Sequence, residues 1–134
     1  MDSTTDIPAA ALTWTKFYAH ESCGKCVPCR EGGTWLMRIL ERVVEGTGTT
    51  DDLDLLLEVG GSICPGDMPP AASADLQLEA TPFPYKMTTI CFVGPSAYVP
   101  AHSALTLFRS EFEARVASSR SRSRIPVTAV GVGS

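Results

Sequence analysis

Apolar residues recur every three or four positions along much of this chain, which is the pattern of amphipathic helices. The first predicted helix begins at Pro8, which suits a first helical turn after an Asp6 cap, and continues to about Ala19. The second is predicted over residues 30–45 and is expected to stop at Gly46. Its apolar stripe consists of Trp35, Leu36, Ile39, Leu40, Val43 and Val44.

Two more helices are predicted further along the chain. Thr50 and the two aspartates after it are a start signal for a third helix, which we expect to end at Gly60 and Gly61. A last helix is predicted from about Pro100 to Ala117, with apolar positions at Leu105, Phe108, Phe112 and Val116. The whole pattern predicts an all-α fold, a small bundle of about four helices.

A proline-rich stretch separates the third predicted helix from the last. Residues 64–85 show little periodicity and contain five prolines, namely Pro65, Pro69, Pro70, Pro82 and Pro84. A loop of that length inside a compact domain is usually functional or a tolerated insertion. A short extended piece is predicted from Met87 to Ile90. We therefore expect a flexible N-terminus over residues 1–10, a helical domain over 11–117 that includes this loop, and a disordered basic tail over 118–134.

Composition limits the possible functions. At 134 residues the chain is large enough for one small domain, and its net charge of −4 gives no argument for nucleic-acid binding. No run of 18 apolar residues is present, so no membrane span is predicted. The first ten residues lack an apolar run and do not read as a signal peptide. The arginines of residues 115–124, which follow the last acid at Glu113, either contact phosphate or lipid or remain solvated.

Five cysteines are the strongest chemical signal in the chain. Their number is odd and no export signal precedes them, so a metal site in a reducing compartment is favoured over a disulfide framework. Cys23, Cys26 and Cys29 lie three residues apart among glycine, lysine, proline and arginine. Such a run can bind three corners of a 4Fe–4S cluster, and one distant cysteine then binds the fourth. Cys64 and Cys91 are the two candidates for that role.

Zinc and the absence of any metal are the alternatives. Structural zinc sites more often combine two separate C-x-x-C arms or include histidine, and this chain has only His20 and His102. Unliganded loop cysteines next to Lys25 and Arg30 would be exposed and open to oxidation. The spacing therefore favours an iron–sulfur cluster and leaves a non-catalytic, zinc-binding or metal-free assembly module as the alternative.

The run from His20 to Gly32, HESCGKCVPCREG, closely resembles the cluster loop of the NADH-binding flavoprotein subunit of bacterial NADH:quinone oxidoreductase, respiratory complex I. Related subunits occur in NAD-linked hydrogenases and formate dehydrogenases. The similarity resumes at residues 91–97, CFVGPSA, and continues through residues 107–113. The proline-rich stretch makes the gap between the third and fourth ligands longer than is usual in that family.

This resemblance implies a 4Fe–4S cluster in a C-terminal helical domain, where it accepts single electrons from a flavin that NADH has reduced. It also implies partners, namely a flavin- and NADH-binding domain or chain and other peripheral-arm subunits at the cytoplasmic, inner face of the cell membrane. This chain contains no glycine-rich nucleotide loop, so we expect it to bind neither FMN nor NADH and to perform no substrate chemistry alone. It would then be a truncated or split piece of the subunit.

Cys91, not Cys64, is predicted to be the fourth ligand. Cys64 is nearer in sequence to the first three, and a cysteine followed by proline closes ferredoxin cluster runs. An irregular proline-rich loop begins directly after it, however, and such a loop holds a ligand poorly. Cys91 stands just before Gly94 and the last predicted helix, where firm elements can fix it, and the family resemblance places the fourth ligand at this turn. The complete predicted ligand set is Cys23, Cys26, Cys29 and Cys91.

Overall fold

Five helices make up the part of the chain that the computed structural model describes, which is residues 4–64 and 88–122. They are α1 (Ile7–Glu21), α2 (Val27–Glu45), α3 (Thr50–Ile63), α4 (Val93–Leu107) and α5 (Arg109–Arg122), and no strand occurs in those ranges. The prediction of an all-α fold is confirmed, with one helix more than expected. No helix in these ranges combines the length and the apolar character needed to cross a membrane.

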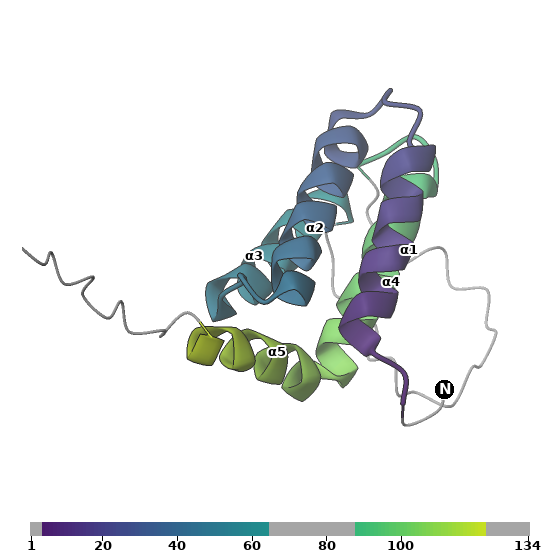
Figure 1. The fold of residues 1–134 in the computed structure, drawn as a ribbon. Helices are drawn as coiled ribbons and strands as arrows, with labels where there is room; N and C mark the ends of the chain where they lie inside the picture. The colour runs from purple at the N-terminus through teal and green to yellow at the C-terminus, as the bar shows by residue number, and fades with distance from the viewer. Residues whose placement is uncertain (1–3, 65–87, 123–134) are drawn as a thin grey trace, which may run out of the picture.

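The helix α2 has a central position in the bundle. It packs against both α1 and α3, while α4 packs along α1 (Figure 1). The last helix, α5, lies across one end of the bundle and contacts all four other helices (Figure 1). The cysteine-bearing connection between α1 and α2 lies at the opposite end (Figure 1).

The core is built on the apolar face of α2, where Leu36, Ile39, Leu40 and Val43 are fully buried. The other four helices add Ile7, Leu12, Leu53, Leu56, Ile63, Leu105, Phe112 and Val116. Full burial of one such side chain contributes roughly 1.5–3 kcal/mol. The apolar stripe that the sequence shows over residues 35–44 is therefore the surface around which the other helices assemble.

Local signals set most of the helix ends. The Asp6 carboxylate accepts the Ala9 N–H at 3.1 Å and caps α1. The helix α2 ends where Gly46 adopts a left-handed φ of 81°, as predicted. The helix α3 begins with a reciprocal capping box between Thr49 and Asp52, so its cap lies one residue before the predicted start.

Among the first three helices, three predicted boundaries are wrong. The helix α1 begins at Ile7, inside the stretch expected to be flexible, because the Asp6 cap precedes it. The helix α2 begins at Val27 and not at residue 30. The helix α3 passes through Gly60 and Gly61 and ends at Ile63. The ring of Tyr98 lies against Gly60 and leaves no room for a side chain, so this glycine serves helix packing and does not end the helix.

The predicted last helix is in fact two helices. The helix α4 begins at Val93 and passes through Pro100, at the loss of one backbone hydrogen bond, and α5 begins after the chain turns at Phe108. The helix α5 continues to Arg122, past the predicted end at Ala117, so the first part of the expected disordered tail is helical. The rest of that tail and nearly all of the proline-rich loop lie outside the described residues.

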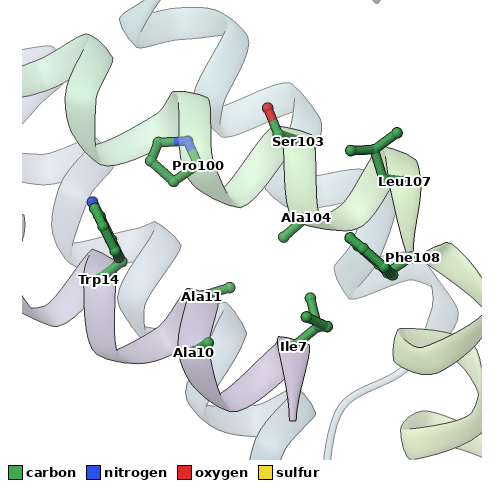
Figure 2. A pocket seen from close by; sticks show the side chains of 9 residues that line it. All are labelled: Ile7, Ala10, Ala11, Trp14, Pro100, Ser103, Ala104, Leu107 and Phe108. Atoms are coloured by element: carbon green, nitrogen blue, oxygen red, sulfur yellow. The ribbon is translucent and has the colours of Figure 1, made fainter. Parts of the chain in front are cut away.

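An apolar groove runs between α1 and α4. It has a volume of about 450 Å³ and is lined by Ile7, Ala10, Ala11, Trp14, Pro100, Ser103, Ala104, Leu107 and Phe108 (Figure 2). Trp14 and Leu107 remain about half exposed at this groove. The paired face of α1 and α4 therefore presents apolar surface to solvent.

Candidate metal centre

The three clustered cysteines lie at the junction of α1 and α2. Cys23 is exposed in the connecting loop, Cys26 is the N-cap residue of α2, and Cys29 is buried in its first turn. The N-terminus of a helix carries partial positive charge and unpaired N–H groups, both of which favour anions such as thiolates. Because α2 begins at Val27, Cys26 and Cys29 lie at this helix end, and Cys23 lies in the loop that leads into it.

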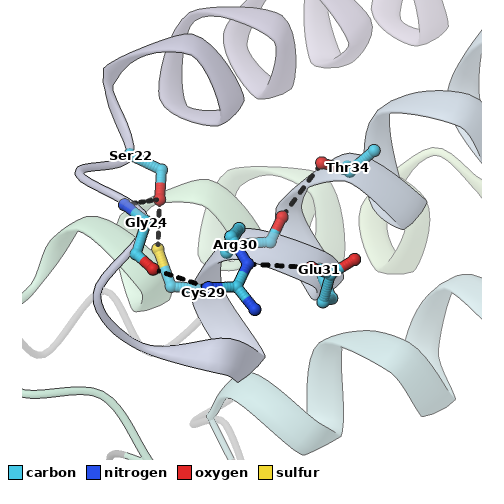
Figure 3. Close-up of polar contacts among 6 residues, drawn as sticks. All are labelled: Ser22, Gly24, Cys29, Arg30, Glu31 and Thr34. Atoms are coloured by element: carbon cyan, nitrogen blue, oxygen red, sulfur yellow. Dashed lines mark hydrogen bonds and ion pairs between the residues drawn. The ribbon is translucent and has the colours of Figure 1, made fainter.

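Hydrogen bonds fix the backbone of the cysteine loop (Figure 3). Gly24 has a φ of 76°, and its N–H donates to Ser22 Oγ at 3.3 Å. Its carbonyl accepts from Arg30 Nη1 at 3.0 Å, and Arg30 Nε donates to Glu31 Oε1 at 2.8 Å. The Ser22 hydroxyl also lies 3.3 Å from Cys29 Sγ. Two contacts therefore join the loop to the first turn of α2.

A second segment, distant in sequence, meets this loop. The Ile90 N–H donates to Cys26 Sγ at 3.3 Å, a contact between residues 64 positions apart. Cys91 follows directly and is exposed, and its carbonyl accepts from Thr89 Oγ1 at 2.8 Å. Residues 88–90, which were predicted to be extended, form bends. The fold therefore brings Cys91 to the same end of the molecule as the first three cysteines.

Thr88 anchors this second segment to the end of α3. Its hydroxyl lies 2.8 Å from the carbonyl oxygens of both Ser62 and Ile63. Its N–H donates to the Ile63 carbonyl at 3.4 Å. The segment that carries Cys91 is thus held at its start by α3 and, two residues later, by the cysteine loop.

Cys64 has a different environment. It is the C-cap residue of α3, is only 1% exposed and belongs to the apolar core. Burial raises the pKa of the Cys64 thiol, because the core disfavours the charged thiolate. Since the thiolate is the form that binds metal, the surroundings of Cys64 oppose ligation.

A cluster and a single metal ion make different demands on the cysteine donors. Among the described residues, no three His, Cys, Asp or Glu side chains gather closely enough to hold one metal ion. A zinc ion needs all of its donors about 2.0–2.3 Å from one centre, whereas a 4Fe–4S cluster takes one thiolate at each of four irons. Two of the cysteine sulfurs are contacted in the structure, Cys26 Sγ by the Ile90 N–H and Cys29 Sγ by the Ser22 hydroxyl.

The two histidines stand apart from any such group in the described chain. His20 is exposed next to the cysteine loop, and its Nδ1 lies 3.0 Å from Glu21 Oε1. His102 lies in α4, where its ring packs edge-on against Tyr98 at 5.5 Å between ring centres. Each histidine thus has a described partner that is not a cysteine.

A helical bundle with three cysteines at a helix N-terminus, and with Cys91 on an adjoining segment, is an arrangement that suits the class of small iron–sulfur domains. Comparison with known proteins shows which iron–sulfur region this chain resembles. Residues 9–68 match the model of the NADH-ubiquinone oxidoreductase-F iron-sulfur binding region. The resemblance found in the sequence is confirmed, and the cofactor of this domain is a 4Fe–4S cluster.

Similar proteins are subunits F of NADH-quinone oxidoreductase. The subunit from Rickettsia rickettsii is 38% identical over 118 residues, which are 88% of this chain and 23% of the relative. The subunits from Mycobacterium tuberculosis and Streptomyces coelicolor are 37% and 36% identical over 115 residues, 86% of this chain and 21% of each relative. The chain thus spans less than a quarter of the length of these curated relatives.

Sequence reasoning missed the part of the site that is not cysteine. The Ser22 hydroxyl had a signal, because a hydroxyl directly before a cysteine run is a possible donor to sulfur. The Ile90 N–H had none, since a backbone group looks the same at every position. The contacts of Thr88 depend on how α3 meets the later segment, which only the fold reveals.

Proposed function

We propose that this chain relays single electrons through a 4Fe–4S cluster held by Cys23, Cys26, Cys29 and Cys91, as part of a complex I-like NADH:quinone oxidoreductase. When bound, the cluster supplies a centre that accepts and releases one electron at a time. The electrons come from a flavin that NADH reduces on a domain or chain outside this one. Reduction of quinone and ion translocation belong to other subunits of the assembly.

The contact between the Ile90 N–H and Cys26 Sγ is the observation that carries the choice of ligands. It puts the residue before Cys91 in direct contact with the first cysteine segment, across 64 positions of sequence. Cys64, by contrast, lies in the core with a raised thiol pKa. The contact therefore supports a ligand set that closes through Cys91.

The surrounding residues position the thiolates and compensate their negative charge. The N-terminus of α2 faces the cysteine loop, and the Ile90 N–H adds a donor to Cys26 Sγ. Burial of Cys29 keeps water from that sulfur, and low exposure of ligands is one of the factors that set the potential of such a centre. Binding of FMN or NADH and any substrate chemistry are not part of the role that we propose for this chain.

The proposed setting is the peripheral arm of the assembly, at the cytoplasmic, inner face of the cell membrane. The partners are the flavin- and NADH-binding domain or chain and the neighbouring peripheral-arm subunits. The names of the relatives support an assembly of the NADH-quinone oxidoreductase type. The proposal includes no nucleic-acid partner and no direct insertion into the membrane.

The test is anaerobic reconstitution of wild type, Cys64→Ala and Cys91→Ala with iron and sulfide under identical conditions. Wild type and Cys64→Ala should each hold about four irons per chain and give a paramagnetic signal after reduction with dithionite. Cys91→Ala should hold three irons or fewer, because one corner of the cluster loses its thiolate. Iron analysis, visible absorption and low-temperature EPR provide the three measurements, and circular dichroism checks that each variant remains helical.

Two results would contradict the proposal in different ways. Loss of iron from Cys64→Ala together with retention in Cys91→Ala would show that the cluster closes through the buried cysteine. A colourless wild-type protein that takes up zinc and no iron would establish the zinc-binding module instead.

A further inference from the structure

Ser22 occupies a particular place in the cysteine loop. Its side-chain oxygen lies 3.3 Å from Cys29 Sγ and 3.3 Å from the Gly24 backbone nitrogen (Figure 3). It is the last residue before Cys23 and the C-cap residue of α1. One hydroxyl therefore links the end of α1, the turn at Gly24 and the cysteine in the first turn of α2.

The direction of these two hydrogen bonds follows from the atoms involved. The Gly24 N–H is a donor, so the Ser22 oxygen accepts from it. The hydroxyl proton of Ser22 then remains available for Cys29 Sγ. A metal-bound thiolate has no proton and can only accept, so Ser22 is the donor in this pair. Both residues are at least partly buried, and the contact is screened by solvent less than an exposed pair.

We propose that Ser22 is a positioning residue that sets the reduction potential of the cluster through Cys29, an inference that rests on the proposed function. Reduction adds one electron to the cluster, and no bond is broken and no proton is transferred. Part of the added negative charge falls on the thiolate sulfurs, so a donor at Cys29 Sγ stabilises the reduced state more than the oxidised state. The Ser22 hydroxyl therefore raises the potential.

Removal of the hydroxyl in Ser22→Ala tests this directly. In an anaerobic redox titration with dithionite followed by EPR, half of the cluster in the variant should be reduced only at a more negative solution potential than in wild type. At the wild-type midpoint, the ratio of reduced to oxidised cluster should fall about tenfold, which corresponds to about 59 mV for a one-electron couple. The potential is the decisive measurement, because a purely structural role would leave it unchanged.

Two matched variants serve as controls. Ser22→Thr keeps the hydroxyl and should keep a midpoint close to that of wild type. Thr34→Ala removes a hydroxyl from α2, the helix that carries Cys29; this hydroxyl donates to the Arg30 carbonyl at 2.9 Å and does not contact sulfur (Figure 3). Its midpoint should also match that of wild type.

The outcomes separate this inference from the proposed function. A Ser22→Ala midpoint equal to that of wild type overturns the inference and leaves the electron relay intact. If Ser22→Ala loses its iron while Ser22→Thr retains it, the hydroxyl is required to hold Cys29, and the positioning role stands. If both lose iron, the hydroxyl is not the cause and the inference fails. Absence of a cluster from wild type overturns the proposed function itself.

Discussion

At the scale of single residues, Gly60 shows that a glycine in a helical sequence can either end the helix or allow close packing against another helix. A pair of glycines after an apolar helical stretch predicts a helix end, but α3 continues through both of them. The space at Gly60 is occupied by the ring of Tyr98, which is itself buried and whose hydroxyl contacts the Leu57 carbonyl at 3.4 Å. The glycine allows α3 and α4 to approach closely.

Gly60→Ala should therefore destabilise the fold and Gly61→Ala should not. A Cβ atom on Gly60 would lie 1.8 Å from Tyr98 Cε2, and the resulting overpacking should lower the free energy of unfolding by about 3 kcal/mol. A Cβ on Gly61 meets nothing within 4 Å, so alanine there should stabilise the helix by about 0.5–1 kcal/mol. Urea unfolding measures both values. Equal effects of the two substitutions would show that Tyr98 does not fill this space.

The residues of the site differ in how far sequence alone reveals them. The spacing of Cys23, Cys26 and Cys29 is local, so their common location could be predicted without a fold. The choice of Cys91 over Cys64 rested on the proline-rich loop after Cys64, on the helix after Cys91 and on the family resemblance. The different burial of Cys64 became visible only when α3 was seen to carry it into the core. The donors from Ser22 and Ile90 were not predicted, because they depend on tertiary distances.

At the scale of helices, the apolar periodicity predicted which segments are helical better than where each one begins. The stripe over residues 35–44 identified α2. The N-cap of α2 is Cys26, which makes no capping hydrogen bond with its side chain, so the sequence contains no capping signal that would locate the start of this helix. The division between α4 and α5 was missed for a related reason. The apolar positions continue in step across Phe108, and the turn there does not interrupt them.

The start of α3 makes a prediction about pH. The hydrogen bond from Arg42, together with those from Thr49, holds the pKa of the Asp52 carboxyl below its usual range despite the opposing effect of burial. A carboxyl with a lowered folded-state pKa contributes stability above its unfolded pKa of about 4 and loses it as the pH falls through the folded-state value. Asp52→Asn should therefore lower the free energy of unfolding by about 1 kcal/mol at neutral pH, and the difference from wild type should shrink below about pH 4.

Urea unfolding at a series of pH values between 7 and 2 provides the measurement, with Asp54→Asn as the control. The Asp54 carboxylate is exposed and pairs with Arg109 on α5 at 3.1 Å, a contact of the kind that contributes at most about 1 kcal/mol. A difference between Asp52→Asn and wild type that stays constant over the whole range would contradict the role assigned to the charge of Asp52.

At the scale of the whole molecule, α5 closes the end of the bundle that lies opposite the cysteine loop (Figure 1). Phe112 and Val116 are buried against the core. Arg115 forms an ion pair with Asp6, the cap of α1, and donates to the Val44 carbonyl at 3.4 Å near the end of α2. One helix therefore ties the beginning of the fold to its middle, and it belongs to the folded domain.

A chain shortened to end at Arg122 should accordingly keep both its thermal unfolding temperature and its iron content. A chain that ends at Ser110 loses two buried side chains, and removal of Phe112 alone should cost about 3–5 kcal/mol. That amount is a large part of the stability of a small domain, so this shorter chain should be substantially unfolded. Thermal unfolding and iron analysis of the two chains test the boundary, and loss of iron from the first would move it beyond Arg122.

The bonds that Thr88 makes to Ser62 and Ile63 bring together the two ends of the connection that contains the proline-rich stretch. Once the ends of a connection are held, its length has little effect on the free energy of folding, because each doubling of the length adds only about 0.6 kcal/mol to the entropic cost of closing the loop. Insertions and deletions between these anchors should thus accumulate without disturbing the position of Cys91. A sequence pattern meant to find this type of centre should fix the C-x-x-C-x-x-C run and the T-T-I-C segment, and leave the interval between them free.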